Sequence, residues 1–198
     1  QILKWIKIPE QIILPVTKNR KSLEELSIQV IGYGQIAKIL QKSLGHLVKS
    51  LTFFDPYKDQ LAFNEKADCL IMACSLNNET KSMIDHKFLK RFSSQCVFIN
   101  AARGSLVNTD DLIAWLNENP KARAYLDVFD PEPIDFSIFP ENVYKTSHLA
   151  GVDEGLDQRI ITFEVKVCVD WLTLTSKQFY DKWSSVYLSN KIKGSDFI

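Results

Sequence analysis

The stretch Ser27–Ala37, which reads SIQVIGYGQIA, decides the fold. Its first five residues are mostly apolar and predict a buried strand, Gly32 permits a tight bend, and Gln35–Leu44 continues with apolar residues at helical spacing. Gly34 lets the backbone come close to a pyrophosphate, and Ala37 is small enough for the new helix to pack on the strand. Free amides at the start of that helix suit phosphate charge. The stretch therefore predicts a strand–turn–helix unit that binds a dinucleotide.

A carboxylate follows the next predicted strand, as a dinucleotide site requires. The predicted strand Leu51–Phe54 ends at Asp55, which lies 21 residues after Gly34. A carboxylate at that place accepts hydrogen bonds from the adenine ribose hydroxyls and repels a 2′-phosphate, which favours NAD over NADP. Lys58 lies near enough in the sequence to leave NADP open. The alternative is a helix-start turn followed by a turn-forming Asp-Pro pair, without any ligand.

The rest of the chain alternates short apolar segments with helical patterns, which is typical of a parallel α/β sheet. The further predicted strands are Asp68–Ala73, Cys96–Asn100, Ala122–Val128 and Val143–Thr146, and the further predicted helices are Glu79–Phe92, Thr109–Asn117 and Leu156–Leu174. The fold class is therefore α/β, a Rossmann-type doubly wound parallel sheet. We divide the chain into a connecting arm (1–24), an NAD-binding domain (25–175) and a C-terminal helical tail (176–198). The tail carries aromatic residues at helical spacing, which either pack on the chain or bind a partner.

The composition gives no support to some classes of partner. The 198 residues include 24 Lys and Arg and 24 Asp and Glu, a balance that gives no reason to expect a nucleic acid or an anionic membrane as partner. No apolar run approaches the roughly 18 residues of a membrane span. The four cysteines show no Cys-x-x-Cys or Cys/His clustering. We therefore expect no metal site, and reduced, buried thiols in a cytoplasmic protein.

Arg103, Glu132 and His148 each lie in the loop after one of the last three predicted strands. Open α/β sheets bind their ligands at the carboxyl ends of the strands. An arginine can hold an anionic substrate and polarise its carbonyl group. A carboxylate beside the histidine favours the imidazolium, which can donate a proton to that oxygen as hydride reaches the carbon. The alternatives for these residues, in the same order, are a surface ion-pair partner, a loop carboxylate before a proline and a capped loop histidine.

With these motifs in place, residues from about Leu26 to Leu174 resemble the nucleotide-binding domain of the D-isomer-specific 2-hydroxyacid dehydrogenases, over about three quarters of the chain. The resemblance is carried by Asn100-Ala101-Ala102-Arg103-Gly104, by Asp127-Val128-Phe129-Asp130-Pro131-Glu132-Pro133 and by Ser147-His148. It implies that Arg103 binds and polarises a 2-oxo acid, and that Glu132 and His148 deliver and remove the proton. It also implies that Asp127 contacts the nicotinamide carboxamide. Together with the glycine turn, it gives these expected cofactor contacts: Gly32, Gly34, Gln35, Ile36, Asp55, Cys74, Ala101 and Asp127.

Several features depart from the family pattern. The loop Ala73–Thr80 lacks the His and the Pro of the family's His-x-Pro-Leu-Thr-x-Glu-Thr segment, and Ser147 stands where a proline is usual. Family members also carry a separate substrate domain made mainly from their N-terminal third, whereas only residues 1–24 precede the nucleotide domain here. We therefore expect the substrate domain to be largely absent from this chain. Because the first residue is Gln1 and not Met, we expect the gene product to start upstream.

Two functional hypotheses remain. The first is an NAD-dependent 2-hydroxyacid dehydrogenase that interconverts a 2-oxo acid and a 2-hydroxy acid, seen as its NAD-binding domain, which by itself binds cofactor but turns over poorly. The second is a non-catalytic, NAD(H)-responsive regulatory module, a use that corepressors related to the family make of the fold. The intact set of Arg103, Glu132 and His148 favours the enzyme. By analogy with the family, we expect a small 2-oxo or 2-hydroxy acid as partner and a homodimer formed through the nucleotide domains.

Overall fold

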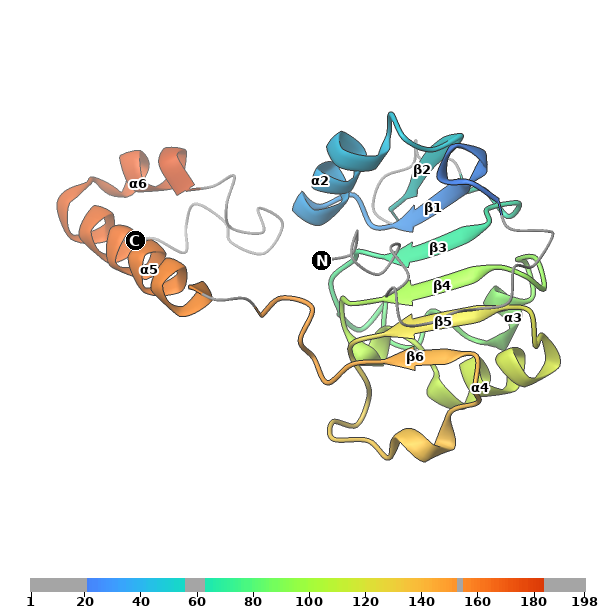
Figure 1. Cartoon of the computed structure of the whole chain (residues 1–198). Coiled ribbons are helices and arrows are strands. Elements are labelled where there is room, and N and C mark those ends of the chain that lie inside the picture. The colour runs from blue at the N-terminus through green and yellow to red at the C-terminus, as the bar shows by residue number, and fades with distance from the viewer. Residues whose placement is uncertain (1–20, 56–62, 153–154, 184–198) are drawn as a thin grey trace. The chain divides into compact units, whose positions relative to one another are not determined.

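The computed structural model describes residues 21–55, 63–152 and 155–183. The chain divides into two compact units, Gln1–Gly151 and Val152–Ile198 (Figure 1). The first unit contains the sheet and the helices packed on it, and the second contains α5 and α6. The predicted arm up to residue 20, the residue Lys58 and the tail from residue 184 lie outside the described residues.

The first unit is built on a six-stranded, all-parallel sheet in the order β2-β1-β3-β4-β5-β6. The strands are β1 (Ser27–Ile31), β2 (Ser50–Phe54), β3 (Cys69–Met72), β4 (Val97–Asn100), β5 (Arg123–Leu126) and β6 (Val143–Lys145). All six arrowheads in Figure 1 end along one edge of the sheet. The winding reverses between β1 and β3, because β2 lies on one side of β1 and β3 on the other. Open α/β sheets bind ligands beyond the strand ends at such a reversal. The predicted doubly wound parallel sheet is confirmed.

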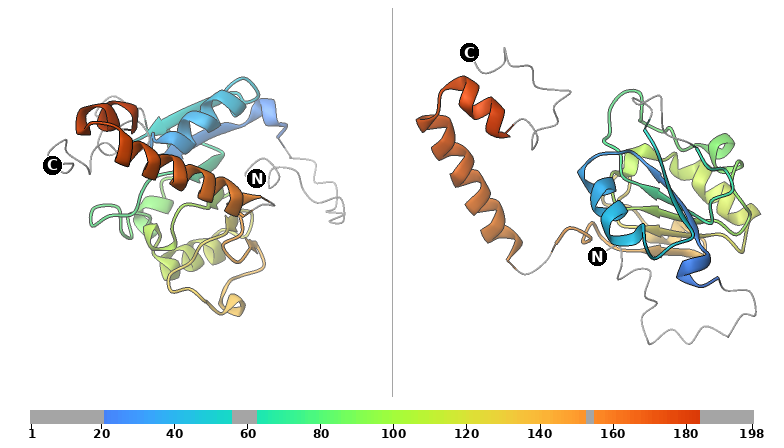
Figure 2. Two further views of the ribbon diagram at one scale, coloured as in Figure 1. Left: turned by 90° about the vertical axis from the view of Figure 1, so that its left-hand side faces the viewer. Right: turned by 90° about the horizontal axis from the view of Figure 1, so that it is seen from above.

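Helices cover both faces of this sheet. The helices of the unit are α2 (Gln35–Leu44), α3 (His86–Leu89) and α4 (Thr109–Glu118), and its 3-10 turns are η1 (Leu23–Glu25), η2 (Gly104–Leu106) and η3 (Phe136–Ile138). Successive strand residues point to opposite faces, and the core divides accordingly. Ile71 of β3 packs in one cluster with Leu40 of α2, whereas its neighbour Leu70 packs in the other with Trp115 of α4. The view from above in Figure 2 shows α2 and the α3–α4 pair on opposite sides of the strands.

The predicted helix Glu79–Phe92 is mostly wrong, because only α3 within it is helical. Thr80 is buried and its hydroxyl fixes the turn before it through hydrogen bonds to the surrounding loop. Ile84 forms a parallel bridge with Val107, so its backbone pairs outside any helix. The side chain of Asp85 then accepts a hydrogen bond from the first turn of α3 and sets where this helix begins. These tertiary contacts outweigh the helical spacing of the apolar residues.

The second unit is a helical hairpin of α5 (Leu156–Thr173) and α6 (Ser176–Trp183). Phe179 and Trp183 of α6 are buried, and the ring of Phe179 meets that of Trp171 edge to face, with 5.0 Å between the centroids. The described part of the predicted tail therefore packs on α5. Among the residues that the structure describes, no helix has the length and apolar character needed to cross a membrane.

Candidate functional site

The glycine turn joins β1 to α2 at the reversal of the sheet. Gly32 adopts φ +105°, and a Cβ on it would lie 2.6 Å from the carbonyl oxygen of Ala73, so the position excludes any other residue. Apart from the residues next to it in the chain, no atom of the described residues lies within 4 Å of the place where a Cβ of Gly34 would stand, which leaves open space beside this backbone. Gly34 is also the N-cap of α2, where no side chain caps the helix and the first turn carries no acidic residue. An uncapped helix N-terminus with open space beside it fits a phosphate group.

Asp55 lies directly beside this turn, at the end of β2. Its Oδ2 accepts a hydrogen bond from the amide of Tyr33 at 3.2 Å. The amide of Gly32 donates to the carbonyl oxygen of Phe54 at 2.6 Å, so the β2 end and the turn are held together by backbone as well. The structure thus brings together the glycines and the carboxylate that the sequence predicts for a dinucleotide. The exposed residues Gln35 and Ile36 begin α2 at the same edge.

Asn100 organises the loop that carries Arg103. This asparagine is buried; its Oδ1 accepts from the amide of Ala102 at 3.0 Å and its Nδ2 donates to the carbonyl oxygen of Arg103 at 2.9 Å. Ala101 is half-buried where β4 ends, and Arg103 is exposed. The role of Asn100 was missed from the sequence, although an asparagine that binds the backbone two residues on is a common turn signal.

Glu132 and His148 form a hydrogen-bonded pair. His148 Nδ1 lies 3.0 Å from Glu132 Oε2, and Glu132 Oε1 accepts from the amide of Phe129 at 2.8 Å. The hydrogen bond from His148 is the main cause that lowers the pKa of Glu132 below its ordinary value, followed by the Phe129 amide. The positive charge of Arg103 lowers this pKa as well, which puts its guanidinium within electrostatic reach of the pair. The structure therefore joins Glu132 to His148 directly, and Arg103 follows the neighbouring strand β4.

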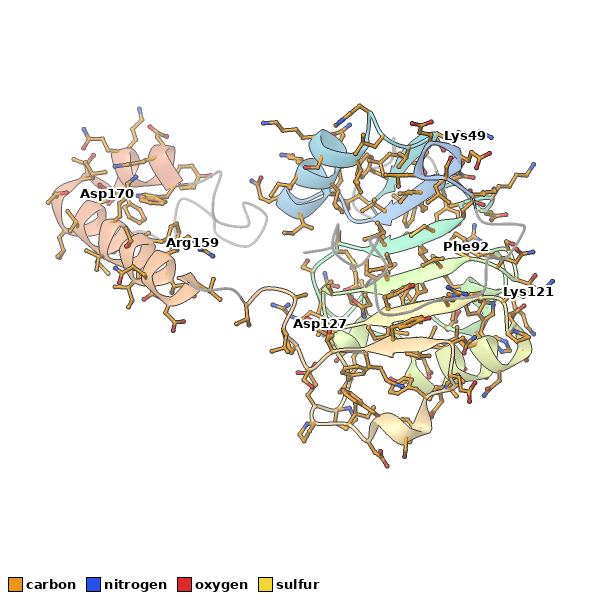
Figure 3. All side chains as sticks on the ribbon, viewed as in Figure 1. Lys49, Phe92, Lys121, Asp127, Arg159 and Asp170 are labelled. Carbon is orange, nitrogen blue, oxygen red and sulfur yellow. The ribbon has the colours of Figure 1, made fainter. Side chains whose placement is uncertain are left out.

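Asp127 holds the loop of His148 in place through hydrogen bonds. It is almost fully buried at the end of β5 (Figure 3), and its carboxylate accepts from the amides of Leu149 at 2.7 Å and Ala150 at 2.8 Å and from the hydroxyl of Thr146. Its carbonyl oxygen accepts from the amide of His148, also at 2.7 Å. His148 adopts φ +55° within this frame, a backbone conformation that few non-glycine residues take. Asp127 thus orders the histidine loop, a contact that the spacing of residues in the sequence did not reveal.

Cys74 follows β3 beside the glycine turn. Burial raises the pKa of its thiol to about 11, so the group is neutral at physiological pH. The loop lacks the His and Pro of the family, yet Asn77 and Thr80 hold it: the amide of Asn77 donates to the Thr80 hydroxyl at 2.8 Å, and that hydroxyl donates to the carbonyl oxygen of Ser75 at 2.8 Å. The backbone beside Gly32 is therefore ordered without the family's proline.

Two further observations limit the chemistry that the site can perform. His86 begins α3 with its Nε2 3.1 Å from Glu118 Oε2 at the end of α4, so this pair joins two helices and does not follow a strand end. Within residues 21–55, 63–152 and 155–183, no three His, Cys, Asp or Glu side chains gather in a way that could hold a metal ion. The chemistry available at the site is therefore that of an arginine, a carboxylate–imidazole pair and a phosphate-binding turn.

Comparison with known proteins identifies the fold and the family. The profile of the D-isomer specific 2-hydroxyacid dehydrogenase, NAD binding domain, matches residues 14–150. The chain belongs to this family. It is an NAD-binding domain, and the expected resemblance, fold and cofactor are confirmed.

Relatives and solved structures agree with this assignment. The chain is 28% identical to an erythronate-4-phosphate dehydrogenase of Blochmanniella floridana, in a match that covers 77% of this chain and 48% of the relative. It is 27% identical to a glyoxylate/hydroxypyruvate reductase of Arabidopsis thaliana, in a match that covers 65% of this chain and 43% of the relative. The crystal structure of D-lactate dehydrogenase with NAD⁺ from Lactobacillus jensenii shares the fold, with a TM-score of 0.67 at 21% identity, over 79% of this chain and 55% of that one. The chain thus spans about half the length of the relatives it matches.

Proposed function

We propose that this chain provides the cofactor-binding half of an NAD-dependent dehydrogenase that interconverts a 2-oxo acid and a 2-hydroxy acid by hydride transfer. The observation that carries the proposal is the 3.0 Å hydrogen bond between His148 Nδ1 and Glu132 Oε2, with the charge of Arg103 close by. Structural histidines are more often buried, whereas the side chain of His148 is 55% exposed and that of Glu132 38%. An exposed, oriented imidazole beside a cation suits proton transfer to an anionic ligand.

Each member of the trio has a distinct part in this proposal. The guanidinium of Arg103 binds the carboxylate and carbonyl oxygens of the 2-oxo acid in a forked geometry and polarises the carbonyl. Glu132 fixes the ring of His148 by accepting from Nδ1, which leaves Nε2 to exchange a proton with the substrate oxygen. The charge on Glu132 also stabilises the imidazolium before it donates the proton. In the reverse direction, the same nitrogen accepts the proton of the 2-hydroxy acid.

The glycine turn and the strand ends are proposed to hold the cofactor. NAD supplies the hydride chemistry when bound. Gly32, Gly34, Gln35 and Ile36 receive the pyrophosphate at the start of α2, and Asp55 binds the adenine ribose. Cys74, Ala101 and Asp127 line the path to the nicotinamide, with the neutral thiol of Cys74 as an apolar wall. Asp127 already accepts three hydrogen bonds, so it contacts the carboxamide with an oxygen that also holds the His148 loop.

The organisation of the protein is part of the same proposal. We assign the arm to residues 1–24, the NAD-binding domain to 25–175 and the helical tail to 176–198, and expect a homodimer formed through the nucleotide domains, in the cytoplasm. Two of the four cysteines, Cys69 and Cys96, are buried as expected, and burial raises the pKa of both thiols, whereas Cys168 is exposed. Light scattering tests the dimer, and a single species of 22.7 kDa would argue against it.

Turnover of NADH with a panel of 2-oxo acids tests the function. The wild-type chain is expected to change NADH fluorescence on binding. The full-length protein is expected to oxidise NADH with at least one 2-oxo acid, and His148→Ala to bind NADH normally and to lose this oxidation. His86→Ala is the matched control, since His86 also pairs with a glutamate but does not follow a strand end. Equal oxidation by His148→Ala would remove His148 from the mechanism. NADH binding without turnover by any variant would favour the regulatory alternative for this chain.

A further inference from the structure

The loops after β4 and β5 meet at Gly104. This glycine follows Arg103 directly, is buried and begins η2. A Cβ on Gly104 would overlap the carbonyl carbon and oxygen of Phe129 and lie 2.6 Å from Phe129 Cα. Real Cβ atoms essentially never come closer than 3.0 Å to another heavy atom. Because the obstacle is backbone and not the end of a flexible side chain, it cannot swing aside, and the two loops would have to separate.

Each side of this contact leads to a different part of the site. On one side, the peptide bond joins Gly104 to Arg103, whose carbonyl oxygen is held by buried Asn100 at 2.9 Å. On the other side, the amide of Phe129 donates to Glu132 Oε1 at 2.8 Å, and Glu132 Oε2 accepts from His148 Nδ1 at 3.0 Å. The contact between Gly104 and Phe129 therefore lies between the cation and the carboxylate–imidazole pair.

We infer that Gly104 is a positioning residue, whose missing side chain sets the spacing between Arg103 and the Glu132–His148 pair. Relieving the overlap would move Phe129 by a distance on the order of an ångström. Hydrogen bonds between nitrogen and oxygen hold only over roughly 2.7–3.2 Å, so the two bonds that link Phe129 to Glu132 and Glu132 to His148 cannot both absorb such a shift. The inference rests on the proposed function for its catalytic meaning, but its first consequence is a change in geometry that needs no turnover.

The tautomer of His148 reports this geometry directly. The ring nitrogen that carries the proton is set by the hydrogen bond that it makes, so Glu132 selects the Nδ1–H form of neutral His148. Long-range proton–nitrogen NMR spectra distinguish the two tautomers, and the sequence contains only 3 histidines, which keeps the spectrum simple. The test compares the 198-residue chain with Gly104→Ala and with the control Gly151→Ala, where no atom lies within 4 Å of the added Cβ.

The expected result is a major Nδ1–H form of His148 in the wild type and in Gly151→Ala, and its loss in Gly104→Ala, while the His86 signals stay the same in all three. A folded Gly104→Ala with an unchanged His148 tautomer would overturn the inference. If Gly104→Ala does not fold, the wild type decides the question. It must show a nuclear Overhauser effect between the α protons of Gly104 and Phe129, and the absence of this effect would contradict the proposed contact.

Kinetics separate this inference from the proposed function. If the wild-type chain reduces a 2-oxo acid, Gly104→Ala is expected to lower kcat by roughly 100-fold, the loss typical of a misplacement of about 1 Å, with the KM for NADH unchanged. An unchanged kcat in folded Gly104→Ala would contradict the positioning role. A full-length protein without turnover would count against the proposed function alone, because the tautomer of His148 would still test the position of Gly104.

Discussion

At the scale of single residues, the buried side chain of Asp127 holds the loop that carries His148. Its buried carboxylate accepts from two loop amides and from Thr146, and it does so beside β5, where the sheet is rigid. A buried acceptor that loses its partners, or a donor that loses its acceptor, carries the full cost of desolvation. The left-handed backbone of His148 depends on these bonds for its stability.

Asp127→Asn is therefore expected to destabilise the protein and to loosen the histidine loop. The amide NH₂ would face a backbone donor in place of an oxygen, so at least one buried N–H loses its acceptor, at a cost of about 1–3 kcal/mol. Urea unfolding measures this cost, and hydrogen exchange of the Leu149 and Ala150 amides measures the loosening. Exchange of these two amides at the wild-type rate would show that Asp127 does not hold the loop.

Glu132 makes the site sensitive to acid. Its pKa in the folded protein lies below its ordinary value of 4.5, so it contributes stability above that value that is lost as the pH falls through the folded-state pKa. Glu132→Gln is expected to be less stable than the wild type at about pH 5.5, by a difference that shrinks as the pH is lowered to about 3. Because Glu132 is partly exposed, the difference is small. A gap in the free energy of unfolding that stays constant between these pH values would contradict the assignment.

The sequence predicts the residues of the site better than the contacts that support them. Arg103, Glu132 and His148 follow strand ends, so their meeting at one edge follows from the parallel sheet alone. The roles of Asn100 and Gly104 depend on how one loop lies against the next, and this is set in three dimensions. The sequence pattern therefore predicts which side chains form the site, and the packing between loops determines how they are placed.

At the scale of elements, the helical hairpin of α5 and α6 is closed by buried contacts at one end. Asp170 of α5 (labelled in Figure 3) accepts hydrogen bonds from Trp183 Nε1 at 3.0 Å and from Lys182 Nζ, and the bond from Lys182 is the main cause that lowers the pKa of Asp170. The rings of Phe179 and Trp171 make a further contact between the two helices. The hydrogen bonds of Asp170 and the aromatic pair together explain why a helix as short as α6 packs on α5.

Phe179→Ala is expected to detach α6 from α5. Phe179 is 3% exposed, and truncation of a buried Phe costs about 3–5 kcal/mol. Hydrogen exchange of the α6 amides should therefore become fast, without an effect on the sheet. The matched control is Leu172→Ala on α5, where the side chain is 82% exposed and the expected change is within about 0.5 kcal/mol. Equal exchange of α6 in the two variants would show that the aromatic packing does not hold the hairpin.

The elements themselves follow the sequence where local and tertiary signals agree. β1 and α2 have the predicted bounds, because an apolar run, a glycine turn and a helical spacing all point the same way. The segment around α3 does not form the long helix that its spacing predicts, because Ile84 pairs with Val107 and Asp85 begins a helix that ends within one turn. α4 begins at Thr109 as predicted, with Asn108 as its N-cap, and ends at Glu118, one residue later than predicted.

At the scale of the whole molecule, the chain joins the proposed phosphate-binding turn to one side of the proposed catalytic site. The turn, Asp55 and the trio all lie along the edge where the parallel strands end, on both sides of the reversal between β1 and β3. The chain spans about half the length of the relatives it matches, so the active protein is expected to need groups that the relatives carry elsewhere.

Mapping NAD⁺ on the chain by NMR tests the central claim most directly. Addition of NAD⁺ to the ¹⁵N-labelled protein is predicted to shift the amide signals of Gly34 and Gln35 at the turn together with those of Ala101 and Leu149 at the strand ends. Asp55→Ala should weaken this binding, and Lys121→Ala, an exposed change just before β5, should leave it unchanged. No saturable shifts at millimolar NAD⁺, or shifts confined to residues away from the carboxyl edge of the sheet, would contradict the account.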